Sequence, residues 1–443
     1  MKVAFLGIGL PHYYNGVLNK LVSEGGVDVF NIVDANGTGV LGDAVYQSGT
    51  DVQFRVAALP SAVSYSQTGH RYVGFIGLDR LLEDEQPDVL VTTEPYMYSF
   101  MFDEKLKKAV RRLGIKILLK DIPFRVDTYS AARQKITKRA YRLSDCWFTY
   151  EPELFGKVMA GNPGRARRFL YRVLVKLFSY FRLARFHFFI FGFRILSHKL
   201  ELRKRAYCFP DGHVDYTDDA YEVFESYGVP RQKIFIIRNS PDTDAWFAVR
   251  KAIEGQDPIL PENPHRFVHV GRLTAWKRVD LQLQALALLK KQFSDAELVV
   301  IGYGPEEKNL KTLADNLGVS ESVRFVGGVY DPHLLGRYLL ASSVYVLAGV
   351  GGISINDAMC FGKPIVCSVC DGTEKKLVRQ GYNGVYFKEG DAQDLAHALI
   401  RLFHDQNLLK TMGVHSLDII EREINIHTVI NEYLHAFAYV RAH

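Results

Sequence analysis

A glycine-rich stretch in the second half of the chain, residues 344–364, has the residue types needed to bind an anion. Residues 344–347 are typical of a buried strand, and the pattern from Ser354 to Phe361 predicts a helix. The loop between them contains Gly349, Gly351 and Gly352. Unpaired backbone N–H groups and the helix dipole would point into this loop, which is the usual arrangement of a phosphate site. The alternative is a plain buried strand-to-helix turn.

Asp357 lies one turn into the predicted helix. Its carboxylate is close enough to the loop to accept a hydrogen bond from a sugar hydroxyl. A ligand that carries both phosphate and hydroxyl groups therefore suits this stretch.

Two cations stand near another predicted strand end. Arg272 follows the strand 267–270, and Lys277 precedes the helix 279–289, whose apolar residues recur every three or four positions. A planar guanidinium and a point-like ammonium facing one crevice would neutralise a diphosphate. The alternative is a pair of solvated loop cations. Two further turns follow strands at Gly302-Tyr303-Gly304 and at Gly327-Gly328-Val329-Tyr330, and the backbone of the second could meet a planar base.

The first half of the chain also places charged residues after predicted strands. Glu94 follows the strand 89–92, and Lys120-Asp121 follow the strand 116–119. Carboxylates at the strand ends of an open sheet are candidates for catalysis, and the alternatives are a helix N-cap or a solvated loop charge.

The positioning elements are strands that alternate with helices. In the first half, strands are predicted at 2–6, 27–33, 52–56, 73–75, 89–92, 116–119, 147–150 and 233–237, with helices at 78–85, 103–113 and 219–227. In the second half, they are predicted at 267–270, 297–301, 323–326, 344–347 and 365–368, with helices at 306–317, 333–341 and 392–403. Such alternation predicts doubly wound α/β domains with ligands at the carboxyl ends of the strands. The turn after the first strand leads to Asn15-Gly16, and it is not a G-x-G-x-x-G dinucleotide fingerprint.

Residues 155–200 form a basic, aromatic insertion without any acidic residue. Ten Lys and Arg lie in it, and Arg165, Arg168, Arg172 and Lys176 share one face of a predicted helix. Five phenylalanines follow at Phe186, Phe188, Phe189, Phe191 and Phe193. A basic face beside an aromatic surface predicts helices that lie in an anionic membrane interface, with Arg168, Arg172, Lys176, Phe186, Phe188, Phe189 and Phe191 as membrane-binding residues. The alternatives are a helical hairpin packed on the protein or a dimer contact; a nucleic-acid-binding arm is disfavoured by the density of Phe.

Composition bounds the class of protein. At 443 residues, 48% hydrophobic and 23% charged, the chain predicts a folded protein of two domains. No signal peptide or run of about 20 apolar residues is present, so neither secretion nor a membrane span is expected. Five unevenly spaced cysteines indicate reduced thiols. The C-x-x-C pair Cys367 and Cys370 lacks the partners of a zinc site, and no metal is expected.

Four blocks of the second half together resemble a known family. GRLTAWKRVD, IGYGP, VRFVGGV and the glycine loop with DAMCFGKPIV occur between Phe267 and Phe403 in the order and spacing of family 4 glycosyltransferases of the GT-B fold. A weaker likeness covers the turn near Asn15-Gly16 and the block GVPRQKIFIIRNSPDTD.

This resemblance implies two Rossmann-like domains facing each other across a cleft, with the insertion in the first. The expected ranges are 1–245 for an acceptor domain, 246–264 for a linker, 265–420 for a nucleotide-sugar domain, and 421–443 for a helix packing back on the first domain. No cofactor or metal is expected beyond a nucleoside diphosphate sugar as donor.

The resemblance also implies roles for single residues. Arg272 and Lys277 would hold the diphosphate and act in catalysis, and Asp357 would contact the ribose. The other expected donor contacts are Asn15, Gly16, Gly304, Val329, Tyr330, Gly351, Gly352, Ile353 and Ser354. Asp121 falls near the place of a histidine in relatives and is a catalytic candidate. Gly349 replaces the first glutamate of the family's paired motif, the one that contacts sugar hydroxyls, and Asp357 is one methylene shorter than the second.

The implied activity is sugar transfer, with retention, to a lipid-linked or polysaccharide acceptor. The insertion would place the enzyme peripherally on the cytoplasmic face of the membrane, with no nucleic-acid partner. Two alternatives stay open. One is a sugar-nucleotide epimerase on the same fold, and the other is a degenerate, non-catalytic subunit, which the glycine at position 349 motivates.

Overall fold

The computed structural model describes residues 1–36, 52–66, 71–123, 126–146, 197–351 and 353–443. The chain divides into two compact units, each treated by itself below. The larger comprises Met1–Phe124, Asp211–Ala220 and Gln232–His443, and the smaller comprises Arg125–Pro210 and Tyr221–Arg231.

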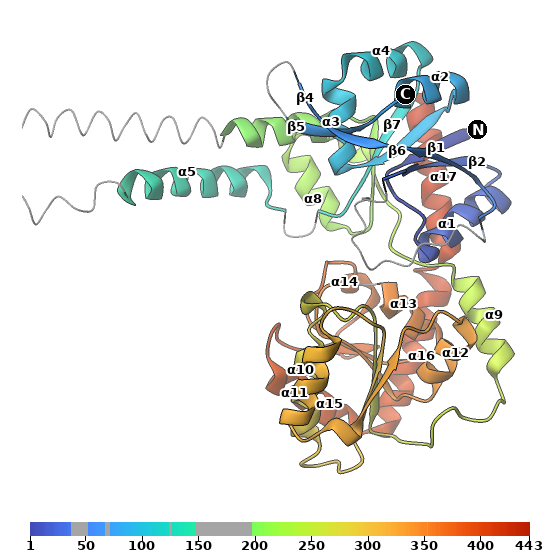
Figure 1. Ribbon diagram of the computed structural model, residues 1–443, viewed down its shortest axis with the longest axis vertical. Coiled ribbons are helices and arrows are strands. Elements are labelled where there is room, and N and C mark those ends of the chain that lie inside the picture. Colours follow the sequence, from blue (N-terminus) through green and yellow to red (C-terminus); the bar gives the residue numbers. More distant parts are fainter. Residues whose placement is uncertain (37–51, 67–70, 124–125, 147–196, 352) are drawn as a thin grey trace, which may run out of the picture. The chain divides into compact units, whose positions relative to one another are not determined.

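The larger unit contains a seven-stranded sheet in which every strand pair is parallel (Figure 1). Its order is β3-β2-β1-β6-β7-β8-β9. The strands are β1 (Lys2–Leu6), β2 (Asp28–Asp34), β3 (Arg55–Leu59), β6 (Val89–Thr93), β7 (Lys116–Asp121), β8 (Gly212–Asp215) and β9 (Ile234–Ile236). A separate antiparallel pair is formed by β4 (Ser61–Tyr65) and β5 (Arg71–Phe75).

Helices pack on this sheet from distant parts of the chain. They are α1 (His12–Ser23), α2 (Leu78–Glu85), α3 (Glu94–Phe102), α4 (Glu104–Leu113) and α17 (Ile426–Ala442). The core between α1, α17 and β1 contains Phe5, Leu18, Tyr433 and Phe437, each fully buried. The Tyr14 and Tyr433 hydroxyls are hydrogen-bonded at 2.6 Å across this core. Asn425 begins α17 with a reciprocal capping box to Thr428, which fixes where the last helix starts.

A second, six-stranded parallel sheet follows the order β12-β11-β10-β13-β14-β15. Its strands are β10 (Arg266–Val270), β11 (Glu297–Ile301), β12 (Val323–Gly327), β13 (Val344–Leu347), β14 (Ile365–Cys367) and β15 (Gly384–Tyr386). Its helices are α9 (Thr243–Ile253), α10 (Val279–Leu289), α11 (Glu307–Asn316), α12 (Pro332–Leu340), α13 (Ile353–Cys360), α14 (Glu374–Leu377), α15 (Ala392–Phe403) and α16 (Gln406–Arg422). The strand order reverses between β10 and β13, so the loops after these two strands diverge to opposite sides. This reversal is where open α/β sheets bind ligands.

The smaller unit is built from α5 (Tyr129–Cys146), the helical residues 197–208 and most of α8 (Asp219–Ser226). Tyr227 makes edge contacts with Tyr129 and Tyr207, at ring separations of 5.5 and 5.1 Å. The proposed membrane-binding residues, Arg168 to Phe191, lie outside the described residues. Within the described part of the chain, no helix combines the length and the apolar character that crossing a bilayer requires.

Most element predictions agree with the structure to within one or two residues, and α2, α10, β11, β13 and α15 agree at both ends. The strand predicted at 52–56 is wrong by three residues, because β3 begins at Arg55, where it pairs with Phe30 of β2. Several elements of the described residues were not predicted. They are the helices α3, α5, α9, α14 and α16 and the short strands β4, β8 and β15. The range expected as linker, 246–264, begins inside α9, and the strand expected at 147–150 lies outside the described residues.

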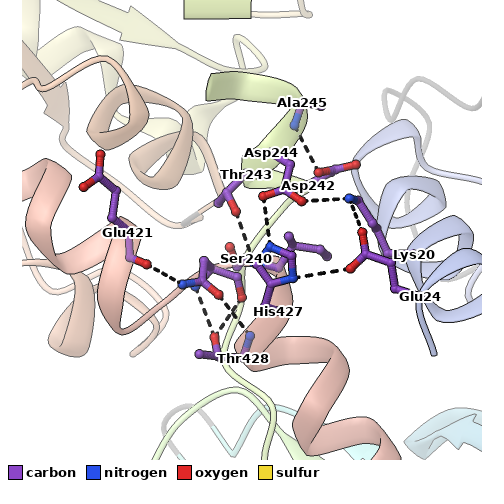
Figure 2. Close-up of polar contacts among 12 residues, drawn as sticks. Lys20, Glu24, Ser240, Asp242, Thr243, Asp244, Ala245, Glu421, His427 and Thr428 are labelled. Carbon is purple, nitrogen blue, oxygen red and sulfur yellow. Dashed lines mark hydrogen bonds and ion pairs between the residues drawn. The ribbon is translucent and has the colours of Figure 1, made fainter. Parts of the chain in front are cut away.

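A polar network joins α1, α9 and α17 (Figure 2). Lys20 places its ammonium 2.6 Å from Glu24 and 2.7 Å from Asp244. His427 approaches the same two carboxylates at 3.3 and 3.2 Å. Burial opposes the charge of Lys20, but hydrogen bonds to Asp244 and Glu24 outweigh it and raise its pKa. The network therefore links α9, which packs on the second sheet, to α1 and α17, which pack on the first.

Candidate functional site

The strongest candidate site lies at the carboxyl ends of β10 and β13, where the second sheet reverses its order. These strands are direct neighbours, with Phe267 beside Val344 and Val268 beside Tyr345. The loop after β10 carries Arg272 and Lys277, and the loop after β13 carries the glycines. The structure therefore brings together the cations and the glycine loop that the sequence predicted separately.

Lys277 lies directly against the glycine loop. A Cβ added at Gly351 would be 2.1 Å from its Nζ, and Gly351 has a φ of +119°, which side chains rarely adopt. Only glycine at position 351 leaves room for the ammonium in this place. Lysine and loop thus form one surface at the start of α13.

Arg272 and Lys277 are half-buried cations that form no salt bridge with any of the described residues. The Arg272 guanidinium lies 5.8 Å from the Trp276 ring centroid. Burial lowers the pKa of Lys277, and the charge of Arg272 lowers it further, while Asp371 and Cys370 oppose this. Two neighbouring cations that destabilise each other are relieved by a bound anion, and a diphosphate supplies charge for both.

Gly349 packs against the backbone of the loop that carries Lys277. A Cβ at this position would lie 2.0 Å from the Trp276 carbonyl oxygen. The same oxygen accepts a hydrogen bond from the Val350 N–H at 2.9 Å. The contact explains in physical terms why this chain has no side chain where the family carries its first glutamate.

Three exposed aromatic residues surround the neighbouring strand ends. Trp276, Tyr303 and Tyr330 follow β10, β11 and β12, with 52%, 43% and 52% of their surface exposed. The rings of Tyr303 and Tyr330 make an edge contact at 6.4 Å. Exposed aromatic faces suit stacking with a nucleobase. Of these three, only Tyr330 was predicted as a donor contact; Trp276 and Tyr303 stand in turns noted in the sequence, but no role was predicted for them.

The remaining predicted donor contacts of the second sheet lie in several different loops and at one helix start. The Ser354 hydroxyl is 2.6 Å from the hydroxyl of Tyr345. Gly304 packs against Leu273, whose carbonyl oxygen would lie 2.4 Å from an added Cβ. Val329 and Tyr330 follow β12, and Ile353 begins α13. Gly352 lies outside the described residues.

Asp357 faces α9. Burial raises the pKa of Asp357 to about 7, and a hydrogen bond from Trp246 partly opposes the shift. In the structure the carboxyl group is therefore held by the indole of α9 and is near half-protonation at neutral pH.

Replacing Asp357 by Asn is expected to change how stability depends on pH. The folded pKa lies above the usual value of 3.8, so the native state holds a proton that the unfolded state has released between about pH 4 and pH 7. Wild-type stability then falls as pH rises through this window, by up to about 1.4 kcal/mol per unit. Thermal midpoints measured from pH 4.5 to 7.5 should show the variant gaining on wild type as pH rises. Asp418→Asn, on α16, is the control, and parallel curves for Asp357→Asn and wild type would contradict the assignment.

A second cluster of polar groups lies at the carboxyl ends of β7 and β8 in the first sheet. The Lys120 ammonium lies 4.9 Å from the Tyr14 ring centroid and 4.4 Å from that of Tyr216. Asp121 pairs in register with Asp215, which is fully buried and accepts no hydrogen bond at either oxygen. Burial raises the pKa of Asp215 well above its usual value, and Asp121 adds to this. A buried carboxyl group with a raised pKa beside a half-buried lysine indicates a functional position, because an unsatisfied buried carboxyl group destabilises the fold.

Charged residues in loops of the second sheet affect the pKa values of tyrosines near this cluster. Burial raises the pKa of Tyr13 to about 12, with Arg272 opposing, and Asp371 helps to raise that of Tyr216. Asn15 and Gly16 follow Tyr13 and Tyr14 on α1, and a Cβ added at Gly16 would meet Asp242 at 3.1 Å. The Asp121 carboxylate accepts a hydrogen bond from the Ile122 N–H at 2.7 Å. Asp215 was missed because no strand was predicted at 212–215.

Replacing Lys120 by Met is expected to stabilise the protein at neutral pH. Burial lowers the pKa of Lys120 to about 8, although Asp121 and Asp215 oppose the shift. Between about pH 8 and 10.5 the unfolded state holds the proton that the folded state releases, so wild-type stability rises with pH there. Below pH 8 the buried charge is a cost, and the variant should gain about 1–3 kcal/mol after the lost cation–π contacts are subtracted. Thermal midpoints at pH 7 and pH 10 test this, with exposed Lys308→Met as control; an advantage that grows towards pH 10 would contradict it.

One group of metal-ligating residues occurs in the described part of the chain. Ligand atoms of Glu24, Asp244 and His427 lie within 4.8 Å of one another. The Lys20 ammonium already lies between the two carboxylates (Figure 2). The group is therefore a salt-bridge network in which lysine provides the positive charge.

Cys367 and Cys370 are free, fully buried thiols at the end of β14. The hydrogen bond between them and burial raise the pKa of Cys370. A protonated, buried thiol is a poor nucleophile, so this pair packs the loop rather than reacting.

A cavity of about 680 Å³ lies elsewhere on the second sheet, at the amino ends of its strands. Its lining includes Pro264, Ser343 and Pro364, each directly before or near the start of a strand. Burial lowers the pKa of Lys363 there to about 8, while its ammonium donates to the Ser342 carbonyl at 2.7 Å. Because ligands of open α/β sheets bind at carboxyl ends, we place the site at the carboxyl ends of β10 and β13 and not in this cavity.

Two parallel α/β sheets in one chain, with cations and a glycine loop where the second sheet reverses its order, define the GT-B class, and this confirms the predicted fold. HepE from Anabaena in complex with UDP has the same fold, with a TM-score of 0.61 at 15% identity over 99% of this chain and 100% of HepE. The lipopolysaccharide outer core galactosyltransferase WaaB has a TM-score of 0.55 at 14% identity over 98% and 99% of the two chains.

Residues 251–415 match the family model described as Glycosyl transferases group 1. An uncharacterized glycosyltransferase of Methanocaldococcus jannaschii is 31% identical over 191 residues, 41% of this chain and 48% of that protein. The amylovoran biosynthesis glycosyltransferase AmsK of Erwinia amylovora is 28% identical over 211 residues, 45% and 49% of the two chains. The chain thus spans about half the length of these curated relatives. The predicted resemblance is confirmed at the level of the group 1 glycosyltransferases.

Proposed function

We propose that this chain transfers a sugar, with retention, from a nucleoside diphosphate sugar to a lipid-linked or polysaccharide acceptor. The observation that carries the proposal is a pair of neighbouring cations, Arg272 and Lys277, of which Lys277 lies against Gly351 just before α13. HepE, a structural neighbour, has been solved with UDP and with UDP-glucose. The names of two relatives refer to amylovoran and colanic acid biosynthesis, which supports a polysaccharide acceptor.

In the proposed reaction the bond between the anomeric carbon and the phosphate oxygen breaks, and the acceptor oxygen bonds to the same face of the sugar. The proton of the acceptor hydroxyl passes to the departing phosphate oxygen. Arg272 and Lys277 stabilise the charge that develops on the diphosphate, in the role that a divalent ion has elsewhere. Lys120, Asp121 and Asp215 then lie on the acceptor side.

A donor screen tests the proposal. The full chain is incubated with UDP- and GDP-sugars and a membrane extract, with and without EDTA, and released nucleotide is measured. Transfer that depends on the extract and changes less than about two-fold with EDTA supports it. Sugar isomerisation without an acceptor would instead indicate an epimerase. Absence of release with every donor would indicate a non-catalytic subunit.

We also propose that the basic, aromatic insertion 155–200 holds the enzyme on the cytoplasmic face of the membrane. Ten cations without an acidic residue would favour anionic lipid by about 1 kcal/mol for each cation near the surface. Flotation with phosphatidylserine-containing vesicles tests this. The full chain should float with the vesicles and a variant lacking 155–200 should not, whereas equal flotation of both would refute the assignment.

A further inference from the structure

The loop after β14 is attached to the glycine loop. β14 pairs with β13, with Cys367 beside Leu347. Beyond this pair, the Ser368 N–H donates to Leu347 and its hydroxyl donates to the Ala348 carbonyl at 3.2 Å. The next residues, 369–372, therefore leave the sheet beside the candidate phosphate site.

Asp371, in this loop, has one carboxylate oxygen available. Its Oδ1 accepts hydrogen bonds from the N–H and the hydroxyl of Thr373. Its Oδ2 makes no hydrogen bond or ion pair with any residue in the described ranges, and the side chain is half-buried. The charge of Asp371 also raises the pKa of Lys277, as a carboxylate near the phosphate site would.

Asp371 is a candidate contact for the donor sugar. The sugar is bonded to the second phosphate, so a diphosphate held by Arg272 and Lys277 would bring it close to these two cations. Carboxylate oxygens accept hydrogen bonds from hydroxyl groups, and they do so strongly when charged. No carboxylate can come from position 349, where even a Cβ would collide with the Trp276 carbonyl.

We propose that Asp371 binds hydroxyl groups of the transferred sugar and so determines which sugar the site accepts. The inference rests on the proposed function, since it requires a nucleoside diphosphate sugar at the carboxyl ends of β10 and β13. Asp371 in this chain would supply the carboxylate that the glycine at position 349 cannot. The phosphates stay with Arg272 and Lys277, so loss of Asp371 should affect the sugar and spare the diphosphate.

Asp371→Asn is a clean test, because the amide oxygen can still accept from Thr373 and keep the turn. Binding of UDP, UDP-glucose, UDP-galactose, GDP and GDP-mannose to the full chain is measured by calorimetry. Only the ligands whose base, uracil or guanine, binds to the wild-type chain are compared. For the sugar nucleotides among them, the variant should bind at least about ten-fold more weakly, because it loses a hydrogen bond to a charged group. Its affinity for the nucleoside diphosphate should stay equal or become up to about three-fold tighter, because a negative charge near the phosphates is gone. Asp418→Asn is the matched control.

The two hypotheses fail differently in this experiment. If the nucleoside diphosphate binds but Asp371→Asn changes both affinities equally or neither, Asp371 is not a sugar contact and the phosphate site stands. If no nucleotide binds to the wild-type chain, the proposed function fails and the assignment of Asp371 fails with it. If the ratio of the affinities for UDP-glucose and UDP-galactose is closer to one in the variant than in wild type, this would directly support a role of Asp371 in sugar specificity.

Discussion

Replacing Lys277 by Met is expected to reduce kcat for sugar transfer by roughly 10²–10³-fold, the typical loss when a group that stabilises transition-state charge is removed. The ammonium lies against Gly351 and forms no salt bridge with any of the described residues. It is therefore available to stabilise the negative charge of a diphosphate, both when the donor binds and when the diphosphate leaves the sugar. Affinity for the nucleoside diphosphate should fall as well, because one of two cations is lost.

The same variant should not be less stable than wild type. Burial and Arg272 both disfavour the charge of Lys277 in the unliganded protein, so its removal should leave the thermal midpoint unchanged or higher. Release of nucleotide and thermal unfolding are measured on Lys277→Met and on the exposed control Lys308→Met. A lower midpoint with proportionate loss of activity would show that Lys277 is structural, and wild-type activity would remove it from the mechanism.

Restoring the family's carboxylate with Gly349→Glu is expected to abolish nucleotide binding rather than improve it. The new Cβ would overlap the Trp276 carbonyl oxygen at 2.0 Å, and that oxygen also holds the Val350 N–H. The loop carrying Lys277 must then move, and crowding of this kind typically costs 1–3 kcal/mol of stability. Displacement of Lys277 and of the glycine loop together should reduce nucleoside diphosphate affinity by more than about ten-fold.

Gly349→Ala adds the Cβ without the carboxylate, so it distinguishes the effects of the two. Because the Cβ causes the clash, this variant should show most of the loss of nucleoside diphosphate affinity expected for Gly349→Glu. Gly74→Ala is the control, because a Cβ there makes contacts of 3.6 Å, an ordinary separation. Thermal unfolding and calorimetric titration with UDP and GDP provide the measurements. Tighter binding or faster transfer by Gly349→Glu would contradict this prediction. It would show that the loops carrying Lys277 and Gly349 can move apart, and that a side chain at position 349 can contact the sugar.

The parts of the site that sequence reasoning found are those carried by short-range patterns. A strand, glycines and a helix start lie within twenty residues, and Arg272 and Lys277 stand between a strand and a helix with clear periodicity. Trp276 and Tyr303 lay inside the same turns, but nothing local shows that their rings are exposed. The alternatives for Glu94 were a helix N-cap or a solvated loop charge; in the structure Thr93 is the N-cap residue and Glu94 is the first residue of α3.

The parts that were missed depend on contacts between distant segments. Asp215 stands on a four-residue strand, β8, that forms only because β7 and β9 flank it. Asp371 becomes notable only when β14 is seen beside β13. The start of β3 at Arg55 is set by its pairing with β2, and the composition of residues 52–59 does not determine that register. Long-range pairing therefore decides what the local pattern leaves open.

The packing of α17 has a consequence for how the chain folds during synthesis. Tyr433 closes the core beside Phe5 and bonds to Tyr14, 419 residues earlier in the chain. The ribosome must therefore deliver the whole second sheet before the first can bury its last apolar face. At ordinary elongation rates that wait lasts roughly tens of seconds, during which the early strands depend on partial structure or on chaperones to avoid aggregation. The second sheet has no such delay, and we expect it to be the first part of the larger unit to reach its native core.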